Sequence, residues 1–259
     1  MSFDVASITK SSPANNHLVI IHGPPGIGKT TFAAQFTNPL FIMTDEGGLG
    51  SNEVHAFPMC KKMSDVFESI RACFKLKVGD RETLVIDSLS SLEAIIFKQV
   101  AIDNGFSRLE NVAYGKGYDI ALSHWVDICS MLRNLLDNGI FKYVVLIAHT
   151  DVSSFKNPDG EDYNFYNIKL HRKAAGLFLE QADVVGFASQ PVIINSSGPR
   201  EGVAGKKGGP VLHLKQKPTL LAKNRRDLPD MINFNAKDFL DGIETFENQN
   251  KNEIKGQTK

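Results

Sequence analysis

Short apolar runs alternate with segments of helical periodicity along most of the chain. Such alternation is typical of a β-sheet flanked by helices. It predicts an α/β fold that is parallel in its early part, with late strands close enough in sequence to pair as antiparallel hairpins. We expect strands at residues 18–21, 40–43, 83–86, 143–148, 184–187, 211–214 and 219–222.

Two helices are the clearest from their patterns. One begins near Ser64, which we expect to be its N-cap, with Asp65 in the first turn. The second has apolar residues at steps of four and three and ends at the pair Asn138–Gly139. Its apolar positions are Ala121, Trp125, Ile128, Leu132 and Leu135.

Two long polar stretches, residues 104–117 and 150–170, match neither pattern and contain scattered aromatic residues. Loops of this length in a compact domain are usually functional, so we expect loops here. Residues 246–259 have almost no apolar side chains, which predicts a disordered tail. The expected organisation is an N-terminal segment at 1–16, one α/β domain at 17–245 and this tail.

Composition narrows the function only in part. The net charge of the 259 residues is zero, so contact with nucleic acid would depend on a local cationic patch. Cys60, Cys73 and Cys129 are far apart, which predicts reduced thiols and neither a zinc site nor a disulfide framework. No apolar run approaches the length of a membrane span and the first ten residues lack a signal-peptide core, so we expect a cytoplasmic protein.

The strongest motif is G-x-x-x-x-G-K-T, located between the first predicted strand and a predicted helix. Its glycines allow backbone N–H groups to turn toward phosphates, and its lysine reaches the β- and γ-phosphates. The motif predicts ATP binding by Gly23, Pro24, Pro25, Gly26, Ile27, Gly28, Lys29, Thr30 and Thr31.

Three further strands end in polar residues that suit phosphate chemistry. Asp87 ends the strand at 83–86 and, with the Thr30 hydroxyl, would hold Mg²⁺. Glu46 follows the strand at 40–43 and is the candidate general base for an attacking water, with Asp45 as the weaker candidate. His149 ends the strand at 143–148, where it could contact the γ-phosphate and report its loss.

The order of these motifs resembles the RecA ATPase core over residues 18–229. The resemblance implies a RecA-like P-loop fold, hydrolysis of ATP with Mg²⁺, and a catalytic glutamate at Glu46. His149 stands where that family usually has a glutamine sensor that opens into a DNA-binding loop. Lys223, Arg225 and Arg226 are similar to the cations that reach a neighbouring subunit's ATP in that family.

Several local features look more like the compact AAA-type ATP-binding proteins of bacteriophages, some of which anneal single strands. These are the short length, the strand end at Ile147–His149, and the segments 115–118 and 223–225. Phe3 and Ala6 match the Phe-x-x-Ala segment by which some RecA-like recombinases join protomers, so residues 1–16 are a candidate oligomerisation arm.

In RecA-like proteins, two loops bind single-stranded DNA, and here they would be residues 104–117 and 150–173. A third stretch, residues 200–226, has eight Lys or Arg against one acid. Aromatic side chains interleaved with cations suit base stacking with phosphate neutralisation. The candidate DNA-binding residues are Arg108, Lys116, Tyr163, Phe165, Lys169, Arg172, Lys173, Lys206 and Lys207.

Taken together, these features predict an ATPase that assembles as a ring or filament on single-stranded DNA and promotes annealing or strand exchange. A phage-encoded protein of this kind would act in the host cytoplasm and could work with a single-strand binding protein. Two alternatives remain: a P-loop kinase acting on a small molecule, and a nucleotide-gated assembly module without hydrolysis.

Overall fold

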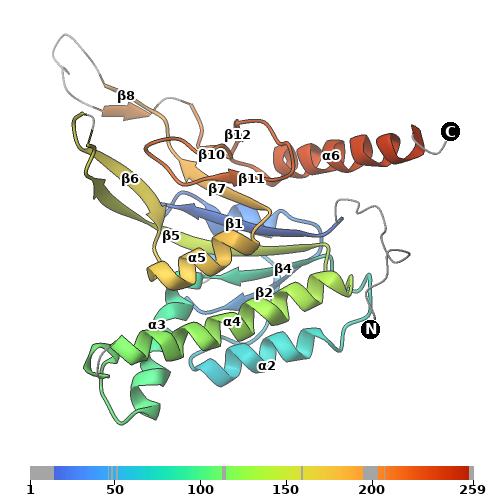
Figure 1. Ribbon diagram of the computed structural model, residues 1–259. Helices are drawn as coiled ribbons and strands as arrows, with labels where there is room; N and C mark the ends of the chain where they lie inside the picture. The colour runs from blue at the N-terminus through green and yellow to red at the C-terminus, as the bar shows by residue number, and fades with distance from the viewer. Residues whose placement is uncertain are drawn as a thin grey trace, which may run out of the picture.

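A computed structural model describes residues 15–256, apart from positions 46, 48, 51, 113–114, 159, 195–203 and 207. Helices and strands alternate along the chain (Figure 1). The strands are β1 His17–Gly23, β2 Pro39–Met43, β3 His55–Ala56, β4 Thr83–Asp87, β5 Tyr143–Phe155, β6 Tyr163–Ile168, β7 Val184–Ser189, β8 Val192–Ile194, β9 Ala204–Lys206, β10 Val211–His213, β11 Lys223–Asn224 and β12 Met231–Asn233. The helices are α1 Lys29–Ala34, α2 Met63–Cys73, α3 Leu89–Asp103, the 3-10 helix η2 Leu109–Asn111, α4 Lys116–Asp137, α5 Arg172–Gln181 and α6 Ala236–Gly256.

The central sheet has the strand order β12-β10-β7-β1-β5-β4-β2-β3. Strands β7, β1, β5, β4, β2 and β3 run parallel, while β10 and β11 pair antiparallel with β7, and β12 pairs antiparallel with β10. The predicted α/β fold, with a mostly parallel sheet and late antiparallel strands, is confirmed.

Both faces of the parallel sheet are covered, which explains why its strands are continuous apolar runs. In β1, Leu18 and Ile20 belong to the core beneath α2, α3, α4 and α5. Val19 and Ile21 belong to the opposite core, with residues of α1 and α6. Each such side chain contributes roughly 1.5–3 kcal/mol when fully buried, so this layer holds the nucleotide-binding loop on a rigid base.

Six of the seven predicted strands are present. The prediction of a strand at 219–222 is wrong, because the pairing with β7 is made by Lys223 and Asn224 instead. Residues 217–220 form a turn closed by the pair Lys217 and Leu220. The apolar side chains of Leu220 and Ala222 are buried by local packing against Phe187, so their hydrophobicity did not indicate a strand.

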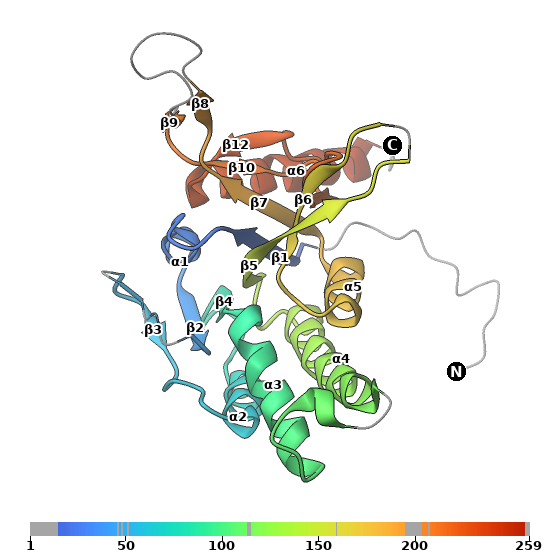
Figure 2. The same ribbon diagram turned by 90° about the vertical axis from the view of Figure 1, so that its left-hand side faces the viewer.

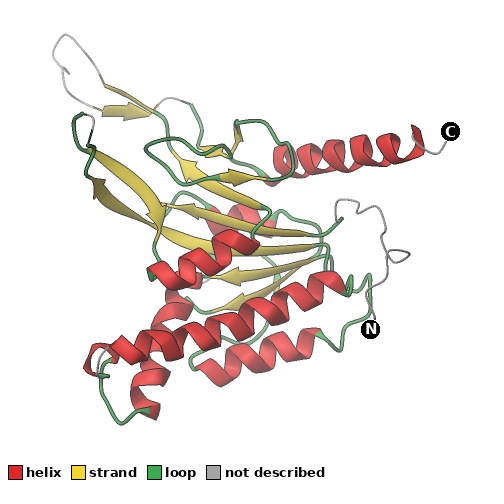
Figure 3. Cartoon of the chain, in the orientation of Figure 1, coloured by secondary structure: helices red, strands yellow, loops and turns green. Residues whose placement is uncertain are grey.

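The largest correction concerns residues 150–170, which we expected to be a loop. Strand β5 continues to Phe155 and pairs antiparallel with β6 over the register from Thr150–Ile168 to Phe155–Tyr163. The hairpin projects beyond the body of the sheet (Figure 3). Because it is a two-stranded ribbon exposed on much of both faces, its sequence has no continuous apolar run to mark it.

The predicted disordered tail is also corrected, because α6 continues to Gly256. Glu247 is buried and accepts hydrogen bonds from His17 Nε2 at 2.9 Å and Lys142 Nζ at 3.1 Å. These contacts join α6 to the first residue of β1 and to the residue before β5. The polar segment 246–259 therefore contains a buried side chain, Glu247, that holds α6 against the sheet. The domain extends past residue 245.

The remaining expectations differ in smaller ways. Helix α2 has Lys62 as its N-cap in place of Ser64, because the Asp65 carboxylate accepts the N–H groups of Lys61 and Lys62. Helix α4 ends as predicted, with Asn138 as its C-cap and a left-handed Gly139. It begins at Lys116, inside the expected loop at 104–117.

The three cysteines are buried and free, as the sequence predicts. Across the described parts of the chain, no helix combines the length and hydropathy needed to cross a bilayer.

Candidate nucleotide-binding site

The loop between β1 and α1 has the backbone that its glycines predict. Gly26 and Gly28 adopt φ values of 74° and 101°, a region that residues with a Cβ rarely occupy. At Gly23, a Cβ would lie 2.7 Å from the Ala188 carbonyl oxygen of β7. Glycine at this position therefore lets β1 approach β7 closely where the loop begins.

Lys29 is folded back onto its own loop. Its Nζ donates to the carbonyl oxygens of Gly23 at 2.9 Å and Pro24 at 3.0 Å. Burial lowers the pKa of Lys29, while the carboxylates of Asp87 and Asp45 oppose that shift. The ammonium group is therefore held by neutral carbonyls that a phosphate could replace with stronger, charge-assisted contacts.

Thr30 and Asp87 are in direct contact, as the motifs predict. The Thr30 hydroxyl donates to Asp87 Oδ2 at 2.6 Å. Burial raises the pKa of Asp87, and the hydrogen bond from Thr30 opposes this. Two oxygen ligands suit Mg²⁺, which takes few protein ligands and completes its shell with water and phosphate. Among the described residues no cluster of three acidic, His or Cys side chains could hold a metal ion.

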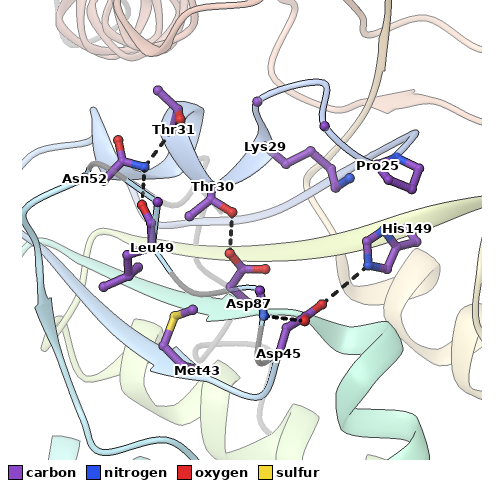
Figure 4. A pocket seen from close by; sticks show the side chains of 14 residues that line it. Pro25, Lys29, Thr30, Thr31, Met43, Asp45, Leu49, Asn52, Asp87 and His149 are labelled. Atoms are coloured by element: carbon purple, nitrogen blue, oxygen red, sulfur yellow. Dashed lines mark hydrogen bonds and ion pairs between the residues drawn. The ribbon is translucent and has the colours of Figure 1, made fainter.

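Asp45 follows the end of β2 and His149 lies midway along β5, and their side chains extend toward each other (Figure 4). His149 Nε2 lies 3.6 Å from Asp45 Oδ2. The Gly47 N–H and the Ser91 hydroxyl both donate to the Asp45 carboxylate, at 3.0 and 3.1 Å. The Gly47 N–H is the main cause that lowers the pKa of Asp45. The Asp45 carboxylate is therefore kept ionised and already accepts two hydrogen bonds, which makes it a better positioning group than a general base.

Glu46 lies outside the described residues, so its role as general base stays a prediction. Met43, at the end of β2, and Asp45 both line the phosphate cavity, and Thr44 is fixed between them.

Sequence reasoning missed a group of hydroxyls that fixes these strand ends. The Thr44 hydroxyl donates to Ser88 O at 2.7 Å and accepts from Ser88 N–H at 2.9 Å. The Ser90 hydroxyl accepts from the His149 N–H at 3.0 Å, and Ser91 holds Asp45. A signal was present in the run of hydroxyl residues directly after the Asp87 strand. We had no reason from sequence to connect it with β2 and β5, which are far away along the chain.

A cavity of about 330 Å³ opens between the loop and these strand ends. Besides the predicted residues it is lined by Leu49, Gly50 and Asn52, from the segment after β2. The Asn52 amide donates to Leu49 O at 2.7 Å and lies 3.4 Å from Thr31 Oγ1, so this segment is tied to α1 (Figure 4). The cavity brings together Pro25, Gly26, Gly28, Lys29, Thr30, Thr31, Asp45, Asp87 and His149.

The predicted trans-acting cations lie elsewhere, and one of them must be withdrawn. Arg226 is buried, pairs with Asp183 at 2.9 Å and donates to Asn16 O at 3.0 Å. Removing one partner of a buried ion pair lowers the free energy of unfolding by about 3–5 kcal/mol. Arg226 is therefore explained by its contribution to stability. Lys223 donates to the carbonyls of Leu179 and Glu180 at the end of α5.

Arg225 is exposed beside them. Strand β11 pairs with the first residues of β7, whereas the phosphate loop follows the last residue of β1. Lys223 and Arg225 are therefore at the end of the sheet away from this chain's own phosphate loop.

The candidate DNA-binding residues fall into separate groups. Arg108 and Lys116 are exposed near the start of α4, while Tyr163 and Phe165 lie on β6. Figures 1 and 2 place these two regions far apart on the face where the parallel strands end. Lys169 and Arg172 are exposed after β6, and Lys173 forms an ion pair with Asp119 of α4. Lys206 ends β9, and Lys207 lies outside the described residues.

Comparisons with known proteins agree with the loop and the sheet. A family model described as an AAA domain matches residues 15–226. No curated protein matches the chain in sequence. Among solved structures, one ATPase domain shares 10% identity, with 78% of this chain and 82% of that chain covered and a TM-score of 0.38, which is too low to carry an argument. The chain has a phosphate-binding loop between β1 and α1 and a mostly parallel sheet flanked by helices, and it belongs to the AAA domain family.

Proposed function

We propose that this protein hydrolyses ATP as an oligomer on single-stranded DNA, where it promotes annealing or strand exchange. The observation that carries the hydrolysis part is the convergence of Lys29, Thr30, Asp87 and His149 on one cavity, from the start of α1 after the glycine-rich loop, the end of β4 and the middle of β5. ATP with Mg²⁺ would supply the phosphoanhydride bond that is cleaved there.

Each side chain has a defined task in this proposal. Lys29 exchanges its loop carbonyls for phosphate oxygens, and Thr30 and Asp87 hold the cation. Glu46 orients and deprotonates the attacking water. His149 lines the cavity with one ring nitrogen toward Asp45, while its backbone carbonyl accepts the Lys169 N–H at 2.9 Å, where β6 has just ended. A change at the phosphate end is therefore transmitted to the hairpin through β5 itself.

Support for a nucleic-acid partner comes from the hairpin and from the local charge. Phe155 and Tyr163 stack at 5.0 Å at the turn end of the hairpin, and Phe155 is 47% exposed. Lys169 and Arg172 are exposed at the base of the same hairpin, and aromatic rings together with cations can bind single strands by stacking and phosphate neutralisation. Within residues 200–226, Lys217 is exposed and would extend this surface, whereas Arg226 is buried and would not.

Assembly is the part that Lys223 and Arg225 would serve. In an oligomer these cations would stabilise charge that develops on a neighbour's γ-phosphate. A direct test mixes the Lys223→Ala/Arg225→Ala protein with Lys29→Ala protein. Each should be inactive alone and should regain hydrolysis in mixed oligomers. Full activity of the double variant as a dilute monomer would contradict action in trans.

A small-molecule kinase is less well supported. Such enzymes close arginine side chains over the phosphates, and no arginine is present among the described residues that line the cavity. No specific observation favours a non-hydrolysing assembly module.

The deciding experiment measures phosphate release from ATP with and without a single-stranded oligonucleotide, together with particle size in a non-hydrolysable ATP analogue. We expect hydrolysis that DNA stimulates, and particles larger than a monomer. Phosphate transfer to a small acceptor, or tight ATP binding without turnover, would contradict the proposal in favour of one alternative or the other.

A further inference from the structure

A second cavity, of about 630 Å³, lies on the other side of the phosphate loop. It is bounded by the β5–β6 hairpin, by the ends of β7 and β10, and by the turn at residues 217–220. Pro25 lines both this cavity and the phosphate cavity. The strand alternation of β5 directs His149 into the phosphate cavity and Thr150 into the second one.

The hairpin register decides which aromatic side chains face the second cavity. Val152 pairs with Tyr166, and Phe155 pairs with Tyr163, at positions of opposite parity in β5. The two pairs therefore occupy opposite faces of the ribbon. Of these two pairs, only Val152 and Tyr166 line the cavity. Tyr163 and Phe165, which the sequence singled out, are on the opposite face of the ribbon and point away from it.

Aromatic rings form a continuous wall in this cavity. Tyr166 lies 5.3 Å from Phe187, and Phe187 lies 6.0 Å from the nearly parallel ring of His213. Phe187 is buried, whereas Tyr166 is 38% exposed. A flat aromatic ligand would thus gain a stacking partner that currently faces solvent.

Polar groups at the end of this wall are oriented for a ligand. Lys217 Nζ lies 3.5 Å from His213 Nδ1, so that nitrogen accepts and Nε2 carries the proton. His213 Nε2 then donates to Ser189 Oγ at 3.0 Å, which leaves the Ser189 hydroxyl hydrogen for an acceptor in the cavity. Burial and Lys217 both lower the pKa of His213, which keeps it in this neutral form. None of the described lining residues carries a carboxylate.

We propose that this cavity binds one unpaired nucleobase of a single-stranded nucleic acid, which stacks on Tyr166 and accepts a hydrogen bond from Ser189. The inference rests on the proposed function and adds to it the position of a base. A nucleobase is flat and carries edge acceptors, and its chain phosphates would meet Lys217 at the rim. Because Pro25 and β5 border both cavities, the base site and the nucleotide site are formed in part by the same residues.

The test is a cycle of four affinities, measured by anisotropy of a fluorescein-labelled oligonucleotide in the presence of a non-hydrolysable ATP analogue. The oligonucleotides are oligo-dT and a matched strand in which abasic sites replace the bases. The proteins are the wild type and Tyr166→Ala. We expect the abasic strand to bind the wild type about tenfold more weakly, and Tyr166→Ala to lose most of that preference.

Matched variants separate stacking from folding. Tyr166→Phe keeps the ring and should restore the preference for intact bases. Val126→Ala truncates an exposed apolar residue of α4 and should change nothing. Ser189→Ala should reduce the preference about threefold with an unchanged thermal midpoint, since one neutral hydrogen bond is lost.

Three results would overturn the inference. If Tyr166→Ala binds both strands as the wild type does, or weakens both equally, no base occupies this cavity, although the proposed function stands. If deoxythymidine monophosphate binds the wild type but not Tyr166→Ala, while the wild type binds the intact and abasic strands equally, the cavity serves a free nucleotide. If the wild type binds no oligonucleotide while it still hydrolyses ATP, both the inference and the DNA part of the proposed function fail.

Discussion

The two halves of β5 have the same backbone and opposite surroundings. Residues 143–148 are almost completely buried between parallel neighbours β1 and β4. Residues 151–155 are exposed and pair only with β6. His149 and Thr150 mark the change, and they face the two different cavities. One strand therefore joins a rigid nucleotide site to a surface that is open to a larger partner.

The contrast shows how a single strand can connect two sites. Packing on both faces fixes the first half to within the tolerance that phosphate chemistry requires. The second half keeps exposed side chains that no core restrains, which suits contact with a partner of variable shape. The predictions below test whether the two halves have separate functions, in order of the size of the expected effect.

The first prediction concerns Lys29, the cation of the phosphate loop. Lys29→Ala should abolish ATP hydrolysis, because no other described side chain in the cavity supplies an ammonium or guanidinium group to the phosphates. Phosphate release and nucleotide affinity measure the effect, and circular dichroism should show an unchanged fold. Lys98→Ala, an exposed lysine of α3, is the matched control and should behave as the wild type. Normal turnover in Lys29→Ala would remove the loop from the mechanism.

The second prediction tests the general base at the end of β2. Glu46→Gln should retain ATP binding and slow hydrolysis by a factor of roughly 100 to 10,000. Single-turnover phosphate release separates the chemical step from binding, and Glu110→Gln serves as an exposed control. If Glu46→Gln turns over at the wild-type rate while Asp45→Asn does not, the base is Asp45.

The third prediction concerns the boundary between the halves. His22 precedes the phosphate loop, contacts Thr150 Oγ1 through Nδ1 and Leu221 O through Nε2, both at 2.9 Å, and is fully buried. Burial lowers its pKa from 6.5 to about 4. The unfolded chain therefore binds a proton more readily than the folded protein, and stability falls as the pH drops from 6.5 toward 4.

At pH 5 this one group should reduce the free energy of unfolding by about 2 kcal/mol relative to pH 8. Urea unfolding at several pH values measures the effect. His22→Gln has no titrating group and should lose about that much less than the wild type between pH 8 and pH 5. Equal losses in both proteins would mean that His22 is not held neutral in the folded state.

The smallest expected effect concerns the residues proposed to contact single-stranded DNA. Lys206→Ala/Lys207→Ala should weaken single-strand binding severalfold and flatten the slope of log affinity against log salt by about 1.4. Tyr163→Ala/Phe165→Ala should also weaken binding but leave the slope unchanged, because stacking releases few counterions. Anisotropy titrations over a range of salt concentrations distinguish the two, and wild-type affinity in both variants would contradict both assignments.

Much of this molecule could be predicted from the sequence, because the relevant signals are local. The glycine spacing before Lys29 specifies a loop that few other backbones can form, and each parallel strand is an apolar run that ends in a polar residue. Carboxyl ends of parallel strands share one edge of a sheet, so the proximity of Asp87, Asp45 and His149 to the loop followed from strand order alone.

The tertiary structure decided what depends on partners that are distant in sequence. The exposed β5–β6 ribbon is a strand only because each half pairs with the other, so its composition resembled a loop. Arg226 looked like a free cation until Asp183 was found beside it, and Glu247 looked like part of a disordered tail until His17 and Lys142 were found around it. The sequence does not indicate whether a charged side chain is buried. The free-energy cost of burying the charge is offset by a partner that only the fold brings near.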